Sequence, residues 1–364
     1  MGALRLYLAL CVVVAHSSAL PFPTHSGTEA VQIFFLISGF NMSLVRDRYP
    51  DTLSFLRSRF LRIYVPAWTV LGTVFCLSIA SGHLRGHWQA LEPWRDSLRV
   101  NGWPAAILAA ISNVFLVGQD WLMFLAGKAG SGLWFCADFW QDPAPLHRLL
   151  LLPQMWSVAM EVVFYLMVPW LWRWNRRCLL LLVILPATAR IVGYAFFGLG
   201  RDPWDNRFLP FEIGLFALGM LVQSIPGRTA YRLPRAFAPR TILLLCLFLA
   251  IAVVQSRVDR AIGAHWAALV FLPLWAWILP GLFAATRNCR ADRILGDLSY
   301  PVYLVHILAV GLVARVETAW KAPIAIGISL LLAEALRRGI EGPLDRYRGR
   351  LRKVSGTIPT GPGD

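Results

Sequence analysis

Charged residues are scarce in this sequence, and their scarcity excludes most classes of soluble protein. Only 15% of the 364 residues are charged, whereas soluble domains usually carry about 25%. Acidic residues are the rarer kind, with 20 Asp and Glu against 35 Lys and Arg, and the formal net charge is +15. With 57% hydrophobic residues, the chain is also too apolar to be disordered. Two classes remain: an integral membrane protein with basic loops, or a very apolar nucleic-acid-binding protein.

Motifs for cofactors and cross-links are also missing. The six cysteines show no paired spacing, so the sequence predicts neither a disulfide framework nor a metal site. The sequence contains no internal repeat and no glycine-rich nucleotide-binding loop. We therefore expect no bound cofactor.

The apolar residues are concentrated in blocks, which decides between the two classes. A membrane-spanning helix needs about 20 mostly apolar residues, and these blocks are too uniform for the alternating strands of a membrane barrel. We predict an all-α, polytopic transmembrane bundle of about ten spans, with a weaker block at 104–118. The predicted spans are residues 3–20, 28–45, 61–81, 150–172, 178–199, 208–224, 241–256, 265–285, 299–318 and 322–340.

Lys and Arg are distributed unequally between the predicted loops. With ten spans, 23 of the 35 basic residues fall on the side of Met1 and 10 on the other. Cytoplasmic loops are the ones enriched in Lys and Arg, so both termini are predicted to be cytoplasmic. A crossing at 104–118 would invert every later loop, so we predict that this block is re-entrant or lies on the membrane surface. The predicted membrane domain covers 1–343, and a basic, then Gly- and Pro-rich cytoplasmic tail covers 344–364.

A few ionisable residues lie inside the predicted spans, where they are costly and mark function by default. Each has a structural alternative, because polar side chains also hold membrane helices together. Arg190 and Glu161, for example, could form a buried pair. Together these residues favour a polar cavity. They are His16, Glu161, Arg190, Glu212, His306 and Glu334.

The loop before the third span holds several arginines, and two of them suggest a phosphate site. Arg59 and Arg62 are three residues apart, which on a helix places both guanidinium groups on one face. Arginine suits bidentate phosphate binding. The alternative is that these residues only fix the topology and meet anionic lipid headgroups. Spacing alone favours that alternative, but the adjoining span leads back toward the polar residues, which favours a phosphate ligand.

Six short stretches form an ordered pattern along the chain. They are Leu4-Arg5 with Val12–His16, Phe34–Phe40, Arg59–Pro66, Trp156–Tyr165, Gly296–His306 and Glu341–Pro343. In this order they resemble the acyltransferase 3 family of membrane acyltransferases, whose first helix ends on a His and which carries an Arg-x-x-Arg-Ile-x-x-Pro element. The chain departs from the family where Gly2-Ala3 stands in place of Asp-Gly, and where Ala159-Met160 stands in place of the common Val-Glu.

The resemblance implies an O-acyltransferase of the cytoplasmic (inner) membrane. It would move an acetyl or other short acyl group from cytoplasmic acyl-CoA, most often acetyl-CoA, to a sugar hydroxyl. Among family members the chain is most similar to the exopolysaccharide and lipid-linked oligosaccharide O-acetyltransferases. The expected partners are therefore acyl-CoA, a lipid-linked carbohydrate acceptor, membrane lipid and proteins of polysaccharide assembly.

The resemblance also implies roles for individual residues. His16 would act as general base or as acyl-carrying nucleophile, and Glu161 would orient His16 or contact the acceptor. Arg59 and Arg62 would hold the donor phosphates. Ser38 and Ser157 are expected only to pack helices. The expected cavity-lining residues are Tyr300 and His306, to which burial cost alone adds Arg190 and Glu212.

Two interpretations stay open from the sequence. The Trp-rich segment 82–149, predicted to be external, is either an interfacial aromatic belt or a surface that stacks on a sugar. A transporter or flippase for a lipid-linked sugar is the alternative function, because buried charges also mark substrate paths. Transporters typically show repeated halves or paired broken helices, which this sequence lacks.

Overall fold

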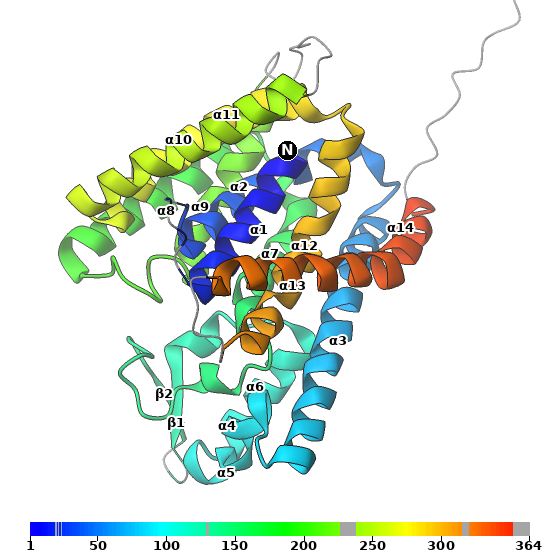
Figure 1. The fold of residues 1–364 in the computed structure, drawn as a ribbon. Coiled ribbons are helices and arrows are strands. Elements are labelled where there is room, and N and C mark those ends of the chain that lie inside the picture. The colour runs from blue at the N-terminus through cyan, green and yellow to red at the C-terminus, as the bar shows by residue number, and fades with distance from the viewer. Residues whose placement is uncertain are drawn as a thin grey trace, which may run out of the picture.

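Long α-helices build most of the chain, as a computed structural model shows (Figure 1). The structure describes residues 1–18, 20, 22, 24–128, 130, 132–225, 238–314 and 320–351, with the backbone alone for 238–245. Residues 226–237 of a predicted cytoplasmic loop and 352–364 of the predicted tail lie outside this description. Every predicted apolar block corresponds to a helix. The helices of the bundle are α1 (Gly2–Ser17), α2 (Gly27–Leu44), α3 (Thr52–Arg85), α7 (Trp156–Leu171), α8 (Arg176–Phe197), α9 (Leu209–Gln223), α10 (Ala238–Ile262), α11 (Ala264–Thr286), α12 (Arg290–Leu312) and α13 (Lys321–Leu336).

The bundle has the character of a membrane fold. Within the described residues, five helices are long and apolar enough to cross a membrane: α3, α7 with its preceding turn, α8, α11 and α12. On α8, large apolar side chains such as Leu185 and Phe196 are 64% and 79% exposed, which is expected of a helix that faces lipid rather than water. The remaining helices are shorter, or carry buried polar residues such as Glu29 and Gln32 on α2. The count of about ten spans therefore stays a prediction.

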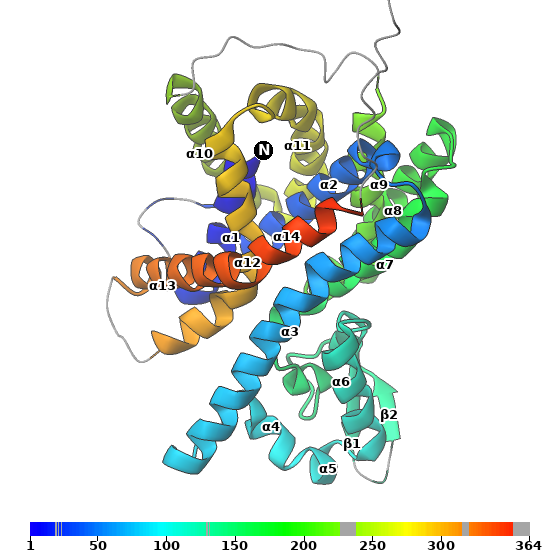
Figure 2. The same cartoon turned by 90° about the vertical axis from the view of Figure 1, so that its right-hand side faces the viewer.

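A small lobe between α3 and α7 extends from one end of the bundle, opposite to the N-terminus (Figures 1 and 2). The lower part of α3 runs beside it. The lobe contains α4 (Glu92–Arg95), α5 (Ser97–Val100), α6 (Trp103–Phe115) and an antiparallel hairpin of β1 (Leu125–Lys128) and β2 (Gly132–Phe135). The predicted cytoplasmic N-terminus and the predicted external segment 82–149 thus lie at opposite ends of the molecule.

Helix α6, the weaker apolar block, ends against the middle of α3. Its 13 residues give a length of about 20 Å, less than the roughly 30 Å hydrocarbon core. Its last carbonyl groups accept hydrogen bonds from α3, from the Tyr64 hydroxyl and the Trp68 indole nitrogen, both at 2.7 Å. Its exposed side chains are all apolar, while its buried ones are small or polar. The helix is thus too short to span the membrane, and the prediction that 104–118 is re-entrant or lies on the membrane surface stays a prediction.

Close helix contacts position the site. Gly39 on α2 and Gly219 on α9 lie so near the facing backbone that an added Cβ atom would overlap the carbonyl groups of Phe216 and Leu36. Small residues at such points let membrane helices pack backbone to backbone. At the start of α12, the Asp292 carboxylate accepts backbone N–H groups from the first turn of α1 at 2.8 and 2.9 Å. This cap aligns α1 with α12 and so brings their far ends together.

The chain continues past α13 through a π-helical turn, Arg337–Glu341, into α14 (Gly342–Gly349). Helix α14 crosses the predicted boundary at residue 343. Its buried Arg348 donates a hydrogen bond to the Ser58 carbonyl of α3 at 3.0 Å. The beginning of the predicted tail is therefore packed against the arginine-bearing turns of α3.

Candidate active site

A cavity of about 400 Å³ lies among α1, α2, α3, α7 and α12. Four predicted site residues line it: Arg59 and Arg62 from α3, Glu161 from α7 and Tyr300 from α12. These residues come from three helices that are far apart in the sequence. Tyr300 also fixes the helices to each other, because its hydroxyl donates to the Ile63 carbonyl of α3 at 2.9 Å.

The charge of this cavity is strongly one-sided. Five arginines line it, and Glu161 is the one carboxylate among its lining residues. The side chains of four of the arginines, Arg5, Arg48, Arg62 and Arg293, make no hydrogen bond or ion pair within the described part of the chain. Clustered guanidinium groups repel one another unless an anion lies between them. All five come from segments that the charge bias assigns to the cytoplasmic side.

Arg59 is the arginine of this cavity that the protein holds in place. It is 5% exposed, and its NH2 group donates to the Tyr49 hydroxyl at 2.9 Å. Its guanidinium carbon also lies 5.8 and 5.9 Å from the ring centres of Phe55 and Tyr165. Arg59 and Arg62 share the cavity face of α3, as their spacing predicts. Arg62 is the freer of the two.

Glu161 is held by two hydroxyl groups rather than by a histidine. Ser38 from α2 and Tyr165 from the next turn of α7 both donate short hydrogen bonds to its Oε1 atom. Within the described residues, neither His16 nor Arg190 contacts Glu161 through a hydrogen bond or ion pair. The structural alternative of a buried Glu161–Arg190 pair therefore does not form, because Arg190 pairs with Glu212. Ser38 and Ser157, expected only to pack helices, both line the cavity.

His16 and His306 lie side by side, just beyond the cavity lining. Their ring centres are 5.1 Å apart. His16 is exposed at the end of α1, and His306 is fully buried on α12. The ring of Tyr303, which lines the cavity, lies 5.4 Å from that of His306. Tyr303 therefore links the inner wall of the cavity to the histidine pair.

Arg190 and Glu212 occupy a different place from the one expected. They form a buried ion pair at 2.5 Å between α8 and α9, with side chains 3% and 0% exposed. The Gln32 amide of α2 adds a hydrogen bond to the same Glu212 oxygen at 3.0 Å. Neither residue is among those lining the cavity. Their geometry is that of a joint between three helices.

Some cavity residues were not predicted from the sequence. Tyr165, Tyr303 and Arg5 lie within the six stretches that resemble the family, so the motifs themselves carried a signal for them. Arg293 lies in a segment predicted to be a loop. It becomes a wall residue because α12 begins at Arg290, well before its apolar block.

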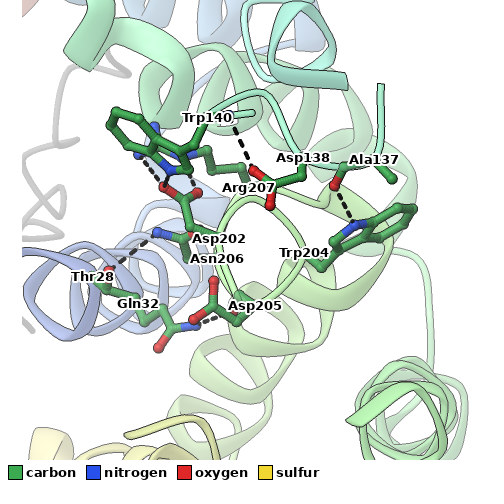
Figure 3. Close-up of polar contacts among 10 residues, drawn as sticks. All are labelled: Thr28, Gln32, Ala137, Asp138, Trp140, Asp202, Trp204, Asp205, Asn206 and Arg207. Atoms are coloured by element: carbon green, nitrogen blue, oxygen red, sulfur yellow. Dashed lines mark hydrogen bonds and ion pairs between the residues drawn. The ribbon is translucent and has the colours of Figure 1, made fainter. Parts of the chain in front are cut away.

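A second group of polar side chains joins the lobe to the bundle (Figure 3). Trp140 of the lobe donates to Asp202 at 3.3 Å, and Trp204 of the α8–α9 loop donates back to the Ala137 carbonyl at 3.0 Å. Asp202 also forms a two-pronged ion pair with Arg207, at 2.5 and 3.1 Å. These hydrogen bonds hold the two loops together at the end of the bundle opposite to the N-terminus.

These contacts between the two loops adjoin the part of the cavity lined by Ser157. The Arg207 guanidinium lies 4.6 Å from the ring centre of Trp156, the residue before Ser157. The ring of Trp140 remains 67% exposed. Burial raises the pKa of the Asp205 carboxyl in the same loop to about 6 and lowers the pKa of the lobe residue His147 to about 4. An exposed aromatic ring beside carboxylates and an arginine is a surface suited to a polyhydroxylated ligand.

Comparison with known proteins gives two matches. The sequence model of a family described as an acyltransferase domain matches residues 1–335. Acyltransferase MdmB of Streptomyces mycarofaciens is 23% identical over 391 aligned positions, covering 98% of this chain and 93% of the relative. No solved structure matches the chain.

Proposed function

The chain belongs to the acyltransferase 3 family of membrane acyltransferases, and from that membership we propose that it is an O-acyltransferase using cytoplasmic acyl-CoA. The proposed reaction moves an acetyl or other short acyl group to a sugar hydroxyl in a surface or exopolysaccharide precursor. Acyl-CoA is a co-substrate here, and no bound cofactor is proposed. The family supports transfer chemistry over the transporter alternative.

The observation that carries the proposal is the cationic cavity. Coenzyme A bears a diphosphate and a phosphate monoester, and a monoester alone carries about −1.5 to −2 charges near neutral pH. Five arginines facing one carboxylate provide a matching positive wall. In this proposal Arg62 and Arg59 bind donor phosphates, and the part of the cavity near Tyr303 receives the thioester.

The proposed chemistry uses His16 as general base. The acceptor hydroxyl oxygen attacks the thioester carbonyl carbon, and its proton passes to His16. The carbon–sulfur bond then breaks, and the departing thiolate takes the proton from His16, leaving an ester and free coenzyme A. Glu161, held by two hydroxyl groups at the cavity wall, contacts the acceptor in this scheme.

We also propose how the protein lies in the membrane. About ten helices cross the inner membrane, both termini are cytoplasmic, and α6 is re-entrant from the outer side. The five cavity arginines support a cytoplasmic entrance, since all come from segments assigned to that side. A lipid-linked carbohydrate would then approach at the lobe, where the exposed Trp140 ring lies beside the Asp202–Arg207 pair.

Radiolabelled acetyl-CoA, added to membranes that carry the protein, tests the proposal. We expect label to enter glycan with the native protein and not with His16→Ala. Arg62→Ala should raise KM for acetyl-CoA about 10- to 100-fold, the worth of one charge-assisted hydrogen bond.

Arg57→Ala is the matched control for the arginine variant. Arg57 lies on the same helix but outside the cavity lining, where it donates to the Tyr347 hydroxyl at 2.9 Å. It should leave KM unchanged. Full glycan labelling by membranes containing His16→Ala would refute the assigned base, and an equal effect of the two arginine variants would refute the donor site.

A further inference from the structure

The hydrogen bonds of His306 fix which of its nitrogens carries the proton. Its Nδ1 atom lies 2.6 Å from the Tyr303 carbonyl oxygen of its own helix. A carbonyl oxygen can only accept, so Nδ1 is the donor. In the neutral ring the Nε2 atom therefore holds a lone pair and can only accept a hydrogen bond.

The same argument applies to His16. Its Nδ1 atom lies 2.9 Å from the Val12 carbonyl oxygen and donates to it. The Nε2 atom of His16 is thus the basic nitrogen, free to take a proton. Once protonated, His16 carries a second N–H group, which needs an acceptor.

His306 supplies a suitable acceptor next to that position. It is fully buried, and its Nε2 atom has no hydrogen-bond partner within the part of the chain that the structure describes. A buried acceptor without a partner is destabilising and calls for an explanation. Its ring is centred 5.1 Å from that of His16.

The neighbouring hydroxyl groups of Tyr303, Ser157, Ser38 and Tyr165 are engaged with other groups. The Tyr303 hydroxyl donates to the Gln154 carbonyl at 2.8 Å and contacts the Ser157 hydroxyl at 2.6 Å. Glu161 accepts from Ser38 and Tyr165. His306 is the group whose ring the structure places directly beside that of His16, and the lone pair on its Nε2 atom is uncommitted within the described residues.

We propose that His306 is a positioning residue whose Nε2 atom accepts a hydrogen bond from the protonated His16 ring during acyl transfer. This inference rests on the proposed function. The acceptor hydroxyl gives its proton to Nε2 of His16, and the resulting N–H group turns toward His306 while the tetrahedral intermediate exists. The same proton then leaves with the coenzyme A thiolate, so His306 gains and loses no proton.

Three substitutions at position 306 test this role. His306→Gln retains an acceptor oxygen near the Nε2 position, whereas His306→Leu and His306→Met fill the buried space without an acceptor. A charge-assisted hydrogen bond made only in the reacting state acts on kcat rather than on KM. We expect about 10- to 100-fold lower kcat for the Leu and Met variants, unchanged KM for acetyl-CoA, and substantial recovery with Gln.

Equilibrium binding of acetyl-CoA to the purified variants shows whether each retains its fold. Equal kcat for Gln, Leu and Met among binding-competent variants would overturn the proposal, because a packing role would not distinguish them by their acceptor atom. A native protein that binds acetyl-CoA but transfers no acyl group would instead refute the proposed function. Normal transfer by both the native protein and His306→Leu would refute the role of His306 alone.

Discussion

Breaking the buried Arg190–Glu212 pair should destabilise the bundle without changing the transfer activity of the protein that remains folded. Glu212→Gln preserves the shape of the side chain and its contact with Gln32, but it leaves the Arg190 guanidinium buried without a counter-charge. Both side chains are at most 3% exposed, so removal of one partner should cost about 3–5 kcal/mol of unfolding free energy. Replacing both residues with apolar ones, Arg190→Met with Glu212→Leu, should restore most of that loss.

The comparison is made by thermal unfolding in detergent, with transfer activity measured on the folded fraction. Glu334→Gln is the matched control, because Glu334 pairs with Arg337 and Arg338 at the surface, with its side chain 31% exposed. It should cost less than about 1 kcal/mol. Native-like unfolding of Glu212→Gln would refute the structural role. A stable but inactive double variant would show that the pair belongs to the active site.

Three further predictions concern packing, electrostatics and topology. Gly39→Ala should strongly reduce the yield of folded protein, because the added methyl group overlaps the Phe216 carbonyl, whereas Gly327→Ala, with open space around it, should be tolerated; detergent-solubilised yield measures both, and equal yields would contradict the close α2–α9 contact. The stability advantage of Asp205→Asn over the native protein should grow as pH rises from 4 to 7. Burial raises the pKa of Asp205 to about 6 in the folded protein, above its pKa in the unfolded chain, so ionisation in this pH range destabilises the native fold. A difference in melting temperature that stays constant with pH would contradict this. Ile111→Cys, in a background without other cysteines, should resist a sulfonated maleimide from both sides of the membrane if the exposed face of α6 contacts lipid, and rapid labelling from either side would exclude that.

Hydropathy alone predicted where the helices lie but misplaced the starts of two important ones. Helix α3 begins at Thr52 rather than near residue 61, because its first turns are amphipathic and carry the arginines. The start was marked locally by Asp51, whose side chain accepts the Ser54 backbone N–H at 2.7 Å as an N-cap. Helix α12 likewise extends back to Arg290, which is why Arg293 reaches the cavity.

The composition of the site was more predictable than its pairing. Burial cost and motif order together identified Arg62, Glu161 and Tyr300, which the structure brings into one cavity. The partners of such residues depend on which helices pack together. Glu161 is bonded to Ser38, 123 residues away, and Arg190 is paired across α8 and α9. No local pattern in the sequence encodes those contacts, because they follow from the tertiary arrangement of the bundle.

The central claim is that the arginine-lined cavity receives a phosphorylated acyl donor. Its most direct test is calorimetric titration of the purified protein with acetyl-CoA and with acetyl-pantetheine, which carries the same thioester without phosphates. The account predicts that acetyl-CoA binds, that its affinity falls as salt is raised, and that acetyl-pantetheine binds far more weakly. Equal binding of the two thioesters, or acetyl-CoA affinity unchanged by Arg62→Ala, would contradict it.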